Sequence, residues 1–395
     1  MKNFSRNNLK DGPQISLFFL IIALVVVGII IISSASSVIS WQAYDDSSYM
    51  LKRQAINVAI GLVAMGAAYR VDSRFLKKIS IPLMLLSLVF LIVVLIPGVG
   101  TSHGGATRWL YLGPFGFQPT EFLKLALVIY LASLFEKKST DVRTMSKGLL
   151  PFLAIIGVLA LLIMKQPDLG SFLIVTSIGG CMYFVSGSRF KHLVALVVVG
   201  ISSIMTLIRL EPYRMARFLV FLDPEKHSND AGYQINQALL AIGSGGLWGL
   251  GFGQSRQKFQ YLPEPATDSI FAIFAEEKGL IGALLIVVLF ALFGYFGYRV
   301  AKNANDVYSR LVAAGITSWI VVQAFLNICA ILSLVPLTGV PLPFISYGGS
   351  SIIFLLIACG ILLNISKNSK EVENEGIGGG RRLRRAHLSN NRNNI

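Results

Sequence analysis

Long stretches without any charged residue constrain this chain more than any other feature. Asp, Glu, Lys and Arg are all absent from residues 12–44, 54–69, 79–107, 148–164, 169–188, 192–208, 279–298 and 311–366. Several of these runs exceed the roughly 20 apolar residues that cross a bilayer as an α-helix. Only 14% of the 395 residues are charged, against roughly 25% in an average soluble domain. The sequence therefore predicts a membrane protein with many spans, and it excludes a soluble enzyme, a secreted disulfide scaffold and a disordered chain.

We expect an all-α, polytopic fold with ten transmembrane helices. The uncharged run 311–366 is too long for one crossing, and the segment 336–343 divides it, because its prolines end helices and favour turns. The first span is longer than the apolar part of a signal peptide, so we interpret it as a retained signal anchor. The predicted spans are residues 15–38, 54–69, 79–96, 119–135, 149–164, 169–187, 191–208, 271–298, 311–334 and 346–366.

The distribution of Lys and Arg predicts the orientation of the chain. The net charge is +15, but the basic residues lie mainly in short links between apolar runs and in the C-terminal tail, which argues against a nucleic-acid partner. Ten crossings place both termini on one side, and that side collects most of these residues, as the cytoplasmic side does. We therefore expect a cytoplasmic N-terminal tail (1–13), a membrane domain (14–366) with a large extracytoplasmic loop (209–270), and a basic cytoplasmic tail (367–395). The basic tail is either a disordered contact for anionic membrane lipid or a solvated charged segment.

Cysteine and histidine offer no cofactor signature. Cys181, Cys329 and Cys359 lie inside apolar runs, so we interpret them as small core residues rather than as a disulfide framework. The four histidines are scattered along the chain, and no metal site is predicted from them.

The large loop 209–270 is more than a polar linker. Within residues 211–222, Arg214 and Arg217 alternate with apolar side chains, which is typical of a helix lying in the headgroup plane. Residues 243–253 are rich in glycine, which indicates turns or close backbone packing. A Walker-type phosphate loop is excluded, because no Gly-Lys-Ser/Thr follows.

Charged groups inside spans or at their ends are costly, so each needs an explanation. Glu121 and Lys124 lie three residues apart at the start of the fourth span. They therefore share one helix face, where they either neutralise each other or bind a charged ligand. Asp168 lies in the turn before the sixth span, and we expect it to cap that helix.

The segment 255–268 carries the richest chemistry in the sequence. Capping of the eighth span by Asp268, with Glu276 and Glu277 placed favourably for the helix dipole, would explain the acids without any ligand. The alternative is a carboxylate base at the outer membrane surface, with cations nearby for a phosphate-bearing substrate. The segment contains two cations and two carboxylates: Arg256, Lys258, Glu264 and Asp268.

The outward loop 97–118 adds a further cation beside an aromatic ring, Arg108 and Trp109. A tryptophan at this depth also suits the membrane interface in its own right. From the residues alone, the sequence predicts an outward-facing pocket for an anionic, lipid-like ligand. It does not indicate a reaction type.

Six motifs along the chain resemble one bacterial family. In their order they are similar to motifs of the SEDS (shape, elongation, division, sporulation) proteins, the FtsW/RodA/SpoVE family, over the chain from the first span to about residue 366. Residues 255–258 and 261–265 resemble the cell-division branch more than the elongation branch. The motifs are Ala106-Thr-Arg-Trp-Leu, Gln118-Pro-Thr-Glu-x-x-Lys124, Lys165-Gln-Pro-Asp-Leu-Gly170, Ile242-Gly-Ser-Gly-Gly246, Tyr261-Leu-Pro-Glu-Pro-x-Thr-Asp268 and Pro341-Leu-Pro-Phe-Ile-Ser-Tyr-Gly-Gly-Ser-Ser351.

The resemblance implies a peptidoglycan glycosyltransferase with a ten-helix fold. Such an enzyme polymerises lipid II, the undecaprenyl-pyrophosphate-linked disaccharide-peptide, at the outer face of the bacterial cytoplasmic (inner) membrane, here at the division septum. The implied partners are a class B penicillin-binding protein, which is a transpeptidase, and other divisome membrane proteins. The resemblance assigns no cofactor, and a divalent cation such as Mg²⁺ or Mn²⁺ near the pyrophosphate is compatible with it.

The resemblance also implies roles for individual residues. The family's essential aspartate corresponds to Asp268, which we expect to be the general base. Family members commonly have histidine two residues earlier, where this chain has Ala266, so a His–Asp dyad is not expected. The expected substrate-binding residues are Glu121, Lys124, Arg108, Trp109, Asp168, Arg256, Lys258 and Glu264.

Two other classes of protein remain open at this stage. Ten helices with intramembrane charges also suit a lipid II flippase, although transport calls for polar groups near mid-bilayer, and the candidates here lie mostly at outer span ends. A scaffold that only recruits the crosslinking enzyme is the second alternative. An elongation-type polymerase is the alternative within the same family.

Overall fold

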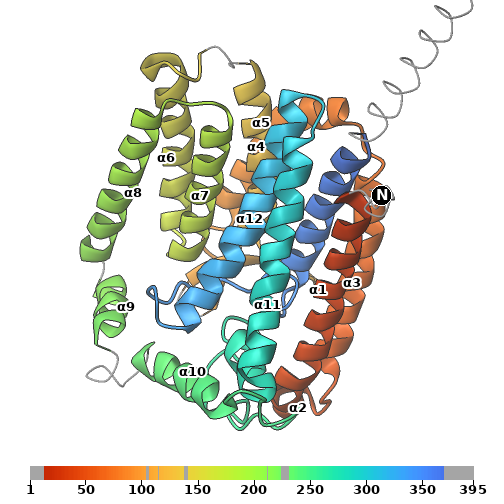
Figure 1. Ribbon diagram of the computed structural model, residues 1–395. Helices are drawn as coiled ribbons and strands as arrows, with labels where there is room; N and C mark the ends of the chain where they lie inside the picture. Colours follow the sequence, from red (N-terminus) through yellow and green to blue (C-terminus); the bar gives the residue numbers. More distant parts are fainter. Residues whose placement is uncertain are drawn as a thin grey trace, which may run out of the picture.

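The computed structural model describes residues 13–103, 106–113, 115–137, 141–210, 212–223 and 231–368 as a bundle of long helices (Figure 1). Most of the expected N-terminal tail and of the basic tail 367–395 lies outside the described residues. The predictions made for those two tails therefore concern residues outside the described ranges. Seven of the described helices are long and apolar enough to cross a membrane. The chain is therefore a multi-pass membrane protein by the length and composition of its helices.

Each predicted span corresponds to a helix of the structure. The seven candidate spans are α1 (Pro13–Ala35), α4 (Ser73–Val93), α6 (Leu150–Met164, preceded by the π-helical turn η1, Met145–Leu149), α8 (Phe190–Leu210), α11 (Ile270–Lys302), α12 (Val307–Ile331) and the final helix Gly349–Asn368. Three further helices pack in the same bundle: α3 (Tyr49–Ala68), α5 (Pro119–Lys137) and α7 (Leu169–Val185).

The loops contain structure that the sequence predicts only in part. The expected headgroup-plane helix is confirmed as a helix, α9 (Pro212–Leu222), whereas α2 (Ser37–Tyr44) and α10 (Ala231–Gly245) were not predicted. The expectation of a purely α-helical fold is wrong in one place, because β1 (Thr101–His103), β2 (Ala106–Leu112) and β3 (Phe115–Phe117) form an antiparallel sheet in the order β1-β2-β3. Thr107, Trp109 and Tyr111, residue types that favour strands, occupy alternate positions of β2.

We expected the eighth span to be one continuous helix. In the structure the corresponding helix, α11, is broken. Gly279 has φ 65° and ψ −166° inside α11, a conformation open to glycine because it lacks a Cβ. At the break, the amides of Leu280 and Ile281 donate to the carbonyls of Gly246 and Leu247 at 2.9 and 3.4 Å. The glycine-rich loop thus replaces the missing helical hydrogen bonds, as buried backbone groups require.

The same loop also supplies donors to the other side of the break. The amides of Leu250 and Gly251 donate to the carbonyls of Glu276 and Glu277 at 3.0 and 3.1 Å. Gly249 leaves no room for a Cβ against the backbone of Glu277. Close backbone packing, one of the two functions expected for the glycines, is therefore confirmed.

Helix α12 lies at the centre of the bundle, where it packs against α11, α7 and α5. Its buried face carries polar side chains as well as apolar ones, including Gln323 and Asn327. By contrast, α8 and α9 lie at the left edge in Figure 1, and much of the apolar surface of α8 is exposed. The chain after α12 then runs through residues 332–348 without regular structure before the final helix.

Candidate functional site

Asp268 lies two residues before α11, in a turn held by the segment that follows α12. The amide of Tyr347 donates to the carbonyl of Ala266 at 2.9 Å, and Ser346 Oγ donates to the carbonyl of Thr267 at 2.6 Å. Asn327 Nδ2 donates to the carbonyl of Asp268 itself at 2.8 Å. Three successive carbonyls are therefore fixed by side chains or amides that lie far along the chain.

The carboxyl group of Asp268 has an unusual environment. Within the part of the chain that the structure describes, it receives no hydrogen bond, and it lies against Gly339, where an added Cβ would be 3.3 Å from Oδ2. Burial raises the pKa of this carboxyl to about 6, and the nearby charge of Glu264 acts in the same direction, whereas Arg217 and Arg108 oppose the rise. A general base works best when its pKa is near the working pH.

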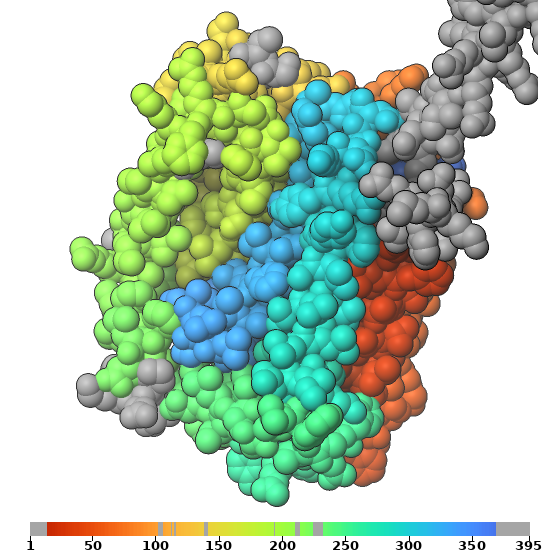
Figure 2. All heavy atoms as spheres, in the orientation of Figure 1, coloured from red at the N-terminus to blue at the C-terminus, as the bar shows by residue number. Residues whose placement is uncertain are grey.

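A first cavity, the arginine cavity, has a volume of about 300 Å³ and lies between α7, α8, α9 and the segment after α12. Its walls are apolar apart from Thr338 and three arginines, Arg108, Arg214 and Arg217. In Figure 2 the surface is hollowed between α8, at the left edge, and the blue segment that follows α12. Apolar walls with several guanidinium groups suit a lipid that carries a phosphate.

A second cavity, the aromatic cavity, has a volume of about 530 Å³. Asp268 itself lines neither cavity, but its neighbour Thr267 lines the aromatic cavity, and Gly339 beside its carboxyl group follows Thr338 of the arginine cavity. The lining is more polar and includes flat rings, which suit a polar ligand with ring faces. It is formed in part by Arg53, Trp109, Tyr111, Glu264, Thr267 and Tyr347.

Strand β2 lies between the two cavities. Consecutive residues of a strand point to opposite faces, so Arg108 lines the arginine cavity while Trp109 lines the aromatic cavity. Arg108 is anchored there by hydrogen bonds to the carbonyls of Gln166 at 3.4 Å and Pro167 at 2.5 Å. The Arg-Trp pair predicted from the sequence therefore contributes one residue to each cavity.

Glu121 and Lys124 form an ion pair inside the bundle, one of the two functions expected for them. Lys124 Nζ lies 2.8 Å from Glu121 Oε1 and 2.9 Å from Gln323 Oε1, and both charged residues are at most 2% exposed. Neither residue lines either of the two cavities. Gln323 in turn donates from Nε2 to the carbonyl of Pro341 at 3.0 Å, so the pair supports the segment that follows α12. Direct binding of substrate by Glu121 and Lys124 stays a prediction.

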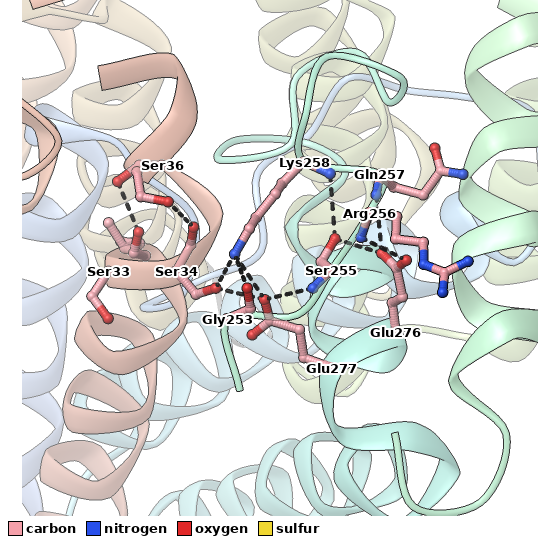
Figure 3. Close-up of polar contacts among 12 residues, drawn as sticks. Ser33, Ser34, Ser36, Gly253, Ser255, Arg256, Gln257, Lys258, Glu276 and Glu277 are labelled. Carbon is pink, nitrogen blue, oxygen red and sulfur yellow. Dashed lines mark hydrogen bonds and ion pairs between the residues drawn. The ribbon is translucent and has the colours of Figure 1, made fainter. Parts of the chain in front are cut away.

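The two cations of segment 255–268, Arg256 and Lys258, line neither of the two cavities. We call the group of Ser34, Ser255, Lys258, Glu276 and Glu277 the serine–glutamate cluster (Figure 3). Lys258 Nζ contacts the Gly253 carbonyl at 2.7 Å, Ser34 Oγ at 3.1 Å and Glu277 Oε1 at 3.4 Å. Lys258 is only 4% exposed, so its ammonium group is engaged inside the protein, and its contact with substrate stays a prediction.

Glu276 holds the turn that contains Arg256. Its carboxylate accepts hydrogen bonds from Ser255 Oγ at 2.5 Å and from the amide of Arg256 at 3.0 Å. Arg256 lines neither of these two cavities, and its contact with substrate stays a prediction. The two glutamates that were expected to act on the helix dipole instead tie α11 to α1 and to the loop.

Two capping predictions have opposite outcomes. Asp168 Oδ1 accepts from the amide of Ser171 at 3.0 Å, which confirms it as the cap of α7. Its Oδ1 also lies 3.9 Å from Arg108 Nη1. Asp268, however, does not cap α11, because the N-cap residue is Ser269, without a side-chain cap.

Three residues near Asp268 were not assigned to the site from the sequence. Arg217 was interpreted only as part of a headgroup-plane helix, although it lines the arginine cavity and donates to the carbonyl of Leu337 at 3.1 Å. Gln323 and Asn327 received no function, although polar residues four apart in an apolar span mark one helix face. That spacing is the signal that could have identified them.

A protein-made metal site is not found among the described residues, because no group of three or more His, Cys, Asp or Glu side chains in these ranges could hold an ion. A divalent cation held by the pyrophosphate of a substrate, which the resemblance allows, stays a prediction.

Comparison with known proteins gives consistent relatives. A model of the FtsW/RodA/SpoVE family, described as "Cell cycle protein", matches residues 15–371. The chain is 42% identical over 361 residues to stage V sporulation protein E of Bacillus subtilis, covering 91% of this chain and 99% of that protein. It is 39% identical over 365 residues to the probable peptidoglycan glycosyltransferase FtsW of Geobacter sulfurreducens, covering 92% of this chain and 98% of that protein.

Solved structures show the same architecture. A chain from a study of how a peptidoglycan synthase complex coordinates polymerisation and crosslinking matches with a TM-score of 0.75 and 28% identity, covering 90% of this chain and 97% of that one. The rod shape determining protein RodA of Thermus thermophilus matches with a TM-score of 0.67 and 28% identity, covering 90% and 96%. The family model and the full-length relatives together establish that this chain belongs to the FtsW/RodA/SpoVE family of cell cycle proteins.

Proposed function

We propose that this protein is a peptidoglycan glycosyltransferase that polymerises lipid II, with Asp268 as the general base. The observation that carries the proposal is that the residues beside Asp268 belong to two cavities. Its neighbour Thr267 lines the more polar, aromatic cavity, and Gly339, which lies against its carboxyl group, follows Thr338 of the apolar cavity with three arginines. A polymerase of this kind needs a lipid diphosphate on one side of the base and a sugar on the other. The FtsW relatives are named as probable peptidoglycan glycosyltransferases, which supports the same activity.

In the proposed reaction, the Asp268 carboxylate accepts the proton from the 4-hydroxyl of the acceptor's terminal N-acetylglucosamine. The oxygen attacks C1 of the donor's N-acetylmuramic acid, the bond from C1 to the phosphate oxygen breaks, and undecaprenyl pyrophosphate leaves with inversion. The leaving group gains negative charge, which Arg108 and Arg217 stabilise from the arginine cavity. A raised carboxyl pKa makes Asp268 a stronger base than an exposed aspartate.

The polyprenyl chain of the donor lies along the apolar walls of the arginine cavity and continues into the bilayer past α8. The acceptor sugar occupies the aromatic cavity, where Trp109 and Tyr347 offer ring faces and Glu264 accepts hydroxyl hydrogen bonds. Asp168 acts through Arg108 rather than on the substrate. This arrangement retains Arg108, Trp109 and Glu264 from the predicted substrate contacts.

For the topology, we propose ten crossings with both termini in the cytoplasm. The seven candidate spans and the three helices α3, α5 and α7 give ten, and the excess of Lys and Arg on the terminal side supports the orientation. The sheet, α9, α10 and Asp268 then lie at the outer face of the cytoplasmic membrane. Lipid II is accessible to the enzyme at that face.

For the cellular role, we propose septal wall synthesis together with a class B penicillin-binding protein and other divisome proteins. The FtsW and sporulation relatives cover nearly the whole chain. The related synthase complex, which coordinates polymerisation with crosslinking, supports a crosslinking partner. An elongation role is the alternative, and depletion of the protein distinguishes the two, because loss of septa gives filaments and loss of elongation gives rounded cells.

The activity is tested with purified full-length protein and its transpeptidase partner in proteoliposomes that contain lipid II. Glycan strands resolved by gel electrophoresis are expected from the wild type and not from Asp268→Asn. A labelled lipid II translocation assay on the same vesicles separates a polymerase from a flippase. Translocation without any polymer would replace our proposal by transport.

A further inference from the structure

Asn327 joins two segments of the site through a single amide group. Its Nδ2 donates to the backbone carbonyl of Asp268 at 2.8 Å and to that of Val340 at 2.7 Å. These carbonyls belong to the turn before α11 and to the segment after α12, which are 59 and 13 residues away from Asn327. Each hydrogen of one amide nitrogen therefore has its own acceptor.

The surroundings of Asn327 make this contact hard to replace. The residue is 2% exposed on the buried face of α12, and its Oδ1 has no hydrogen-bond partner among the described residues. Water is therefore poorly placed to satisfy the two carbonyls if the amide is removed, and a hydrogen bond in such a setting is stronger than in water. Burial of the Asn327 carboxamide costs free energy, which the two hydrogen bonds from Nδ2 must offset.

The segment held by Asn327 is also the floor beneath the Asp268 carboxyl group. Gly339, the residue before Val340, has φ +65°, and a Cβ at this position would lie 3.3 Å from Asp268 Oδ2. One turn earlier on α12, Gln323 donates to the carbonyl of Pro341. The two carbonyls that follow Gly339, those of Val340 and Pro341, are thus fixed to α12 directly beside the point where the carboxylate lies.

We propose that Asn327 is a positioning residue for the glycosyl transfer, which clamps the Asp268 turn onto the Gly339–Val340 backbone and so fixes where the carboxylate lies relative to both cavities. Asn327 does not touch substrate in this arrangement. The inference rests on the proposed function, since it concerns the base of that reaction. It assigns a function to an amide that the sequence motifs do not include.

The clamp has a consequence that a purely structural role lacks. The charged groups that act on the carboxyl group of Asp268 are Glu264 and Asp168, which raise its pKa, and Arg217 and Arg108, which lower it. Removal of the clamp in Asn327→Ala lets the turn move toward water, so the acid limb of the rate profile shifts to lower pH. Asn327→Asp places a negative charge beside the turn, so the limb shifts to higher pH.

The test measures the initial rate of lipid II polymerisation against pH for the full-length wild type, Asn327→Ala and Asn327→Asp, each with the transpeptidase partner. We expect kcat at the optimum to fall about 10²-fold, as misplacement of a catalytic group by about 1 Å does, with little change in KM. The acid limbs should move in opposite directions. The matched control is Ser318→Ala, which removes a buried hydroxyl of α12 that bonds Ala314 and Tyr298, and its acid limb should coincide with that of the wild type.

Uniformly reduced rates at every pH, with the wild-type acid limb in both Asn327 variants, would overturn the proposal. If these variants do not fold, as judged by size-exclusion chromatography, Gly339→Ala probes the same contact from the other side, and an unchanged acid limb in that variant refutes the clamp. Failure of the proposed function is distinguishable, because in that case either the wild type makes no polymer or Asp268→Asn retains polymerisation.

Discussion

The buried pair of Lys258 and Glu277 provides a stability prediction with a clear magnitude. Replacement of Lys258 by methionine keeps the apolar stem and leaves the Glu277 carboxylate without its cation. Loss of one partner of a buried ion pair typically costs about 3–5 kcal/mol. Glu277 keeps hydrogen bonds from Ser34 Oγ at 2.5 Å and from the Ser255 amide at 3.4 Å, so we expect the lower end, about 3 kcal/mol.

The free energy of unfolding is measured by titration with sodium dodecyl sulfate in mixed micelles. The matched control is Lys52→Met, which breaks the Lys52–Asp46 pair at 2.8 Å, whose side chains are 65% and 38% exposed; such pairs contribute about 0–1 kcal/mol. The double variant Lys258→Met/Glu277→Gln removes both charges and should recover part of the loss. Equal losses in Lys258→Met and Lys52→Met, or no recovery in the double variant, would refute the reasoning.

Three further predictions concern the site. Polymerisation should decline as the pH falls through about 6, because a protonated Asp268 cannot accept a proton; an acid limb near 4 in the rate profile contradicts this. Asp268→Asn should unfold at a higher temperature than the wild type at pH 7.5, with a difference that shrinks toward pH 5, because a folded-state pKa above the ordinary value makes the ionised form destabilising and protonation relieves it; equal Tm values at both pH values contradict this. Arg217→Gln should lower kcat about 10²-fold, as loss of a donor to a developing anion does, and a wild-type kcat in the same polymerisation assay would remove Arg217 from the mechanism.

The arrangement of helices follows from local properties of the sequence. Uncharged runs of sufficient length locate the spans because the bilayer requires apolar surface and internal backbone hydrogen bonds. The break of α11 could not be predicted in this way, because its hydrogen bonds come from the glycine-rich loop about 30 residues away, and the loop was interpreted without a known packing partner. The small sheet was missed because β1 and β3 have only three residues each, too few for alternation to be detectable, and the seven residues of β2 were interpreted only as part of an outward loop.

The site was predictable for residues that carry a recognisable motif and less so for their surroundings. Asp268, Arg108 and Trp109 were selected from the sequence. The structure places Arg108 and Trp109 in two different cavities and Asp268 next to Thr267, which lines one of them. Lys258 carries as strong a motif, but its partners Ser34 and Glu277 come from α1 and α11, so only the fold reveals its burial. Charge type indicates that a residue needs a partner, and tertiary packing decides which partner it has.

Polymer formation by purified protein tests the central claim most directly. Wild-type protein with its transpeptidase partner should convert lipid II into long glycan strands, while Asp268→Asn, shown to be folded and bound to the same partner, should yield none above background. Strands of wild-type length and amount from the Asp268→Asn enzyme would contradict the account.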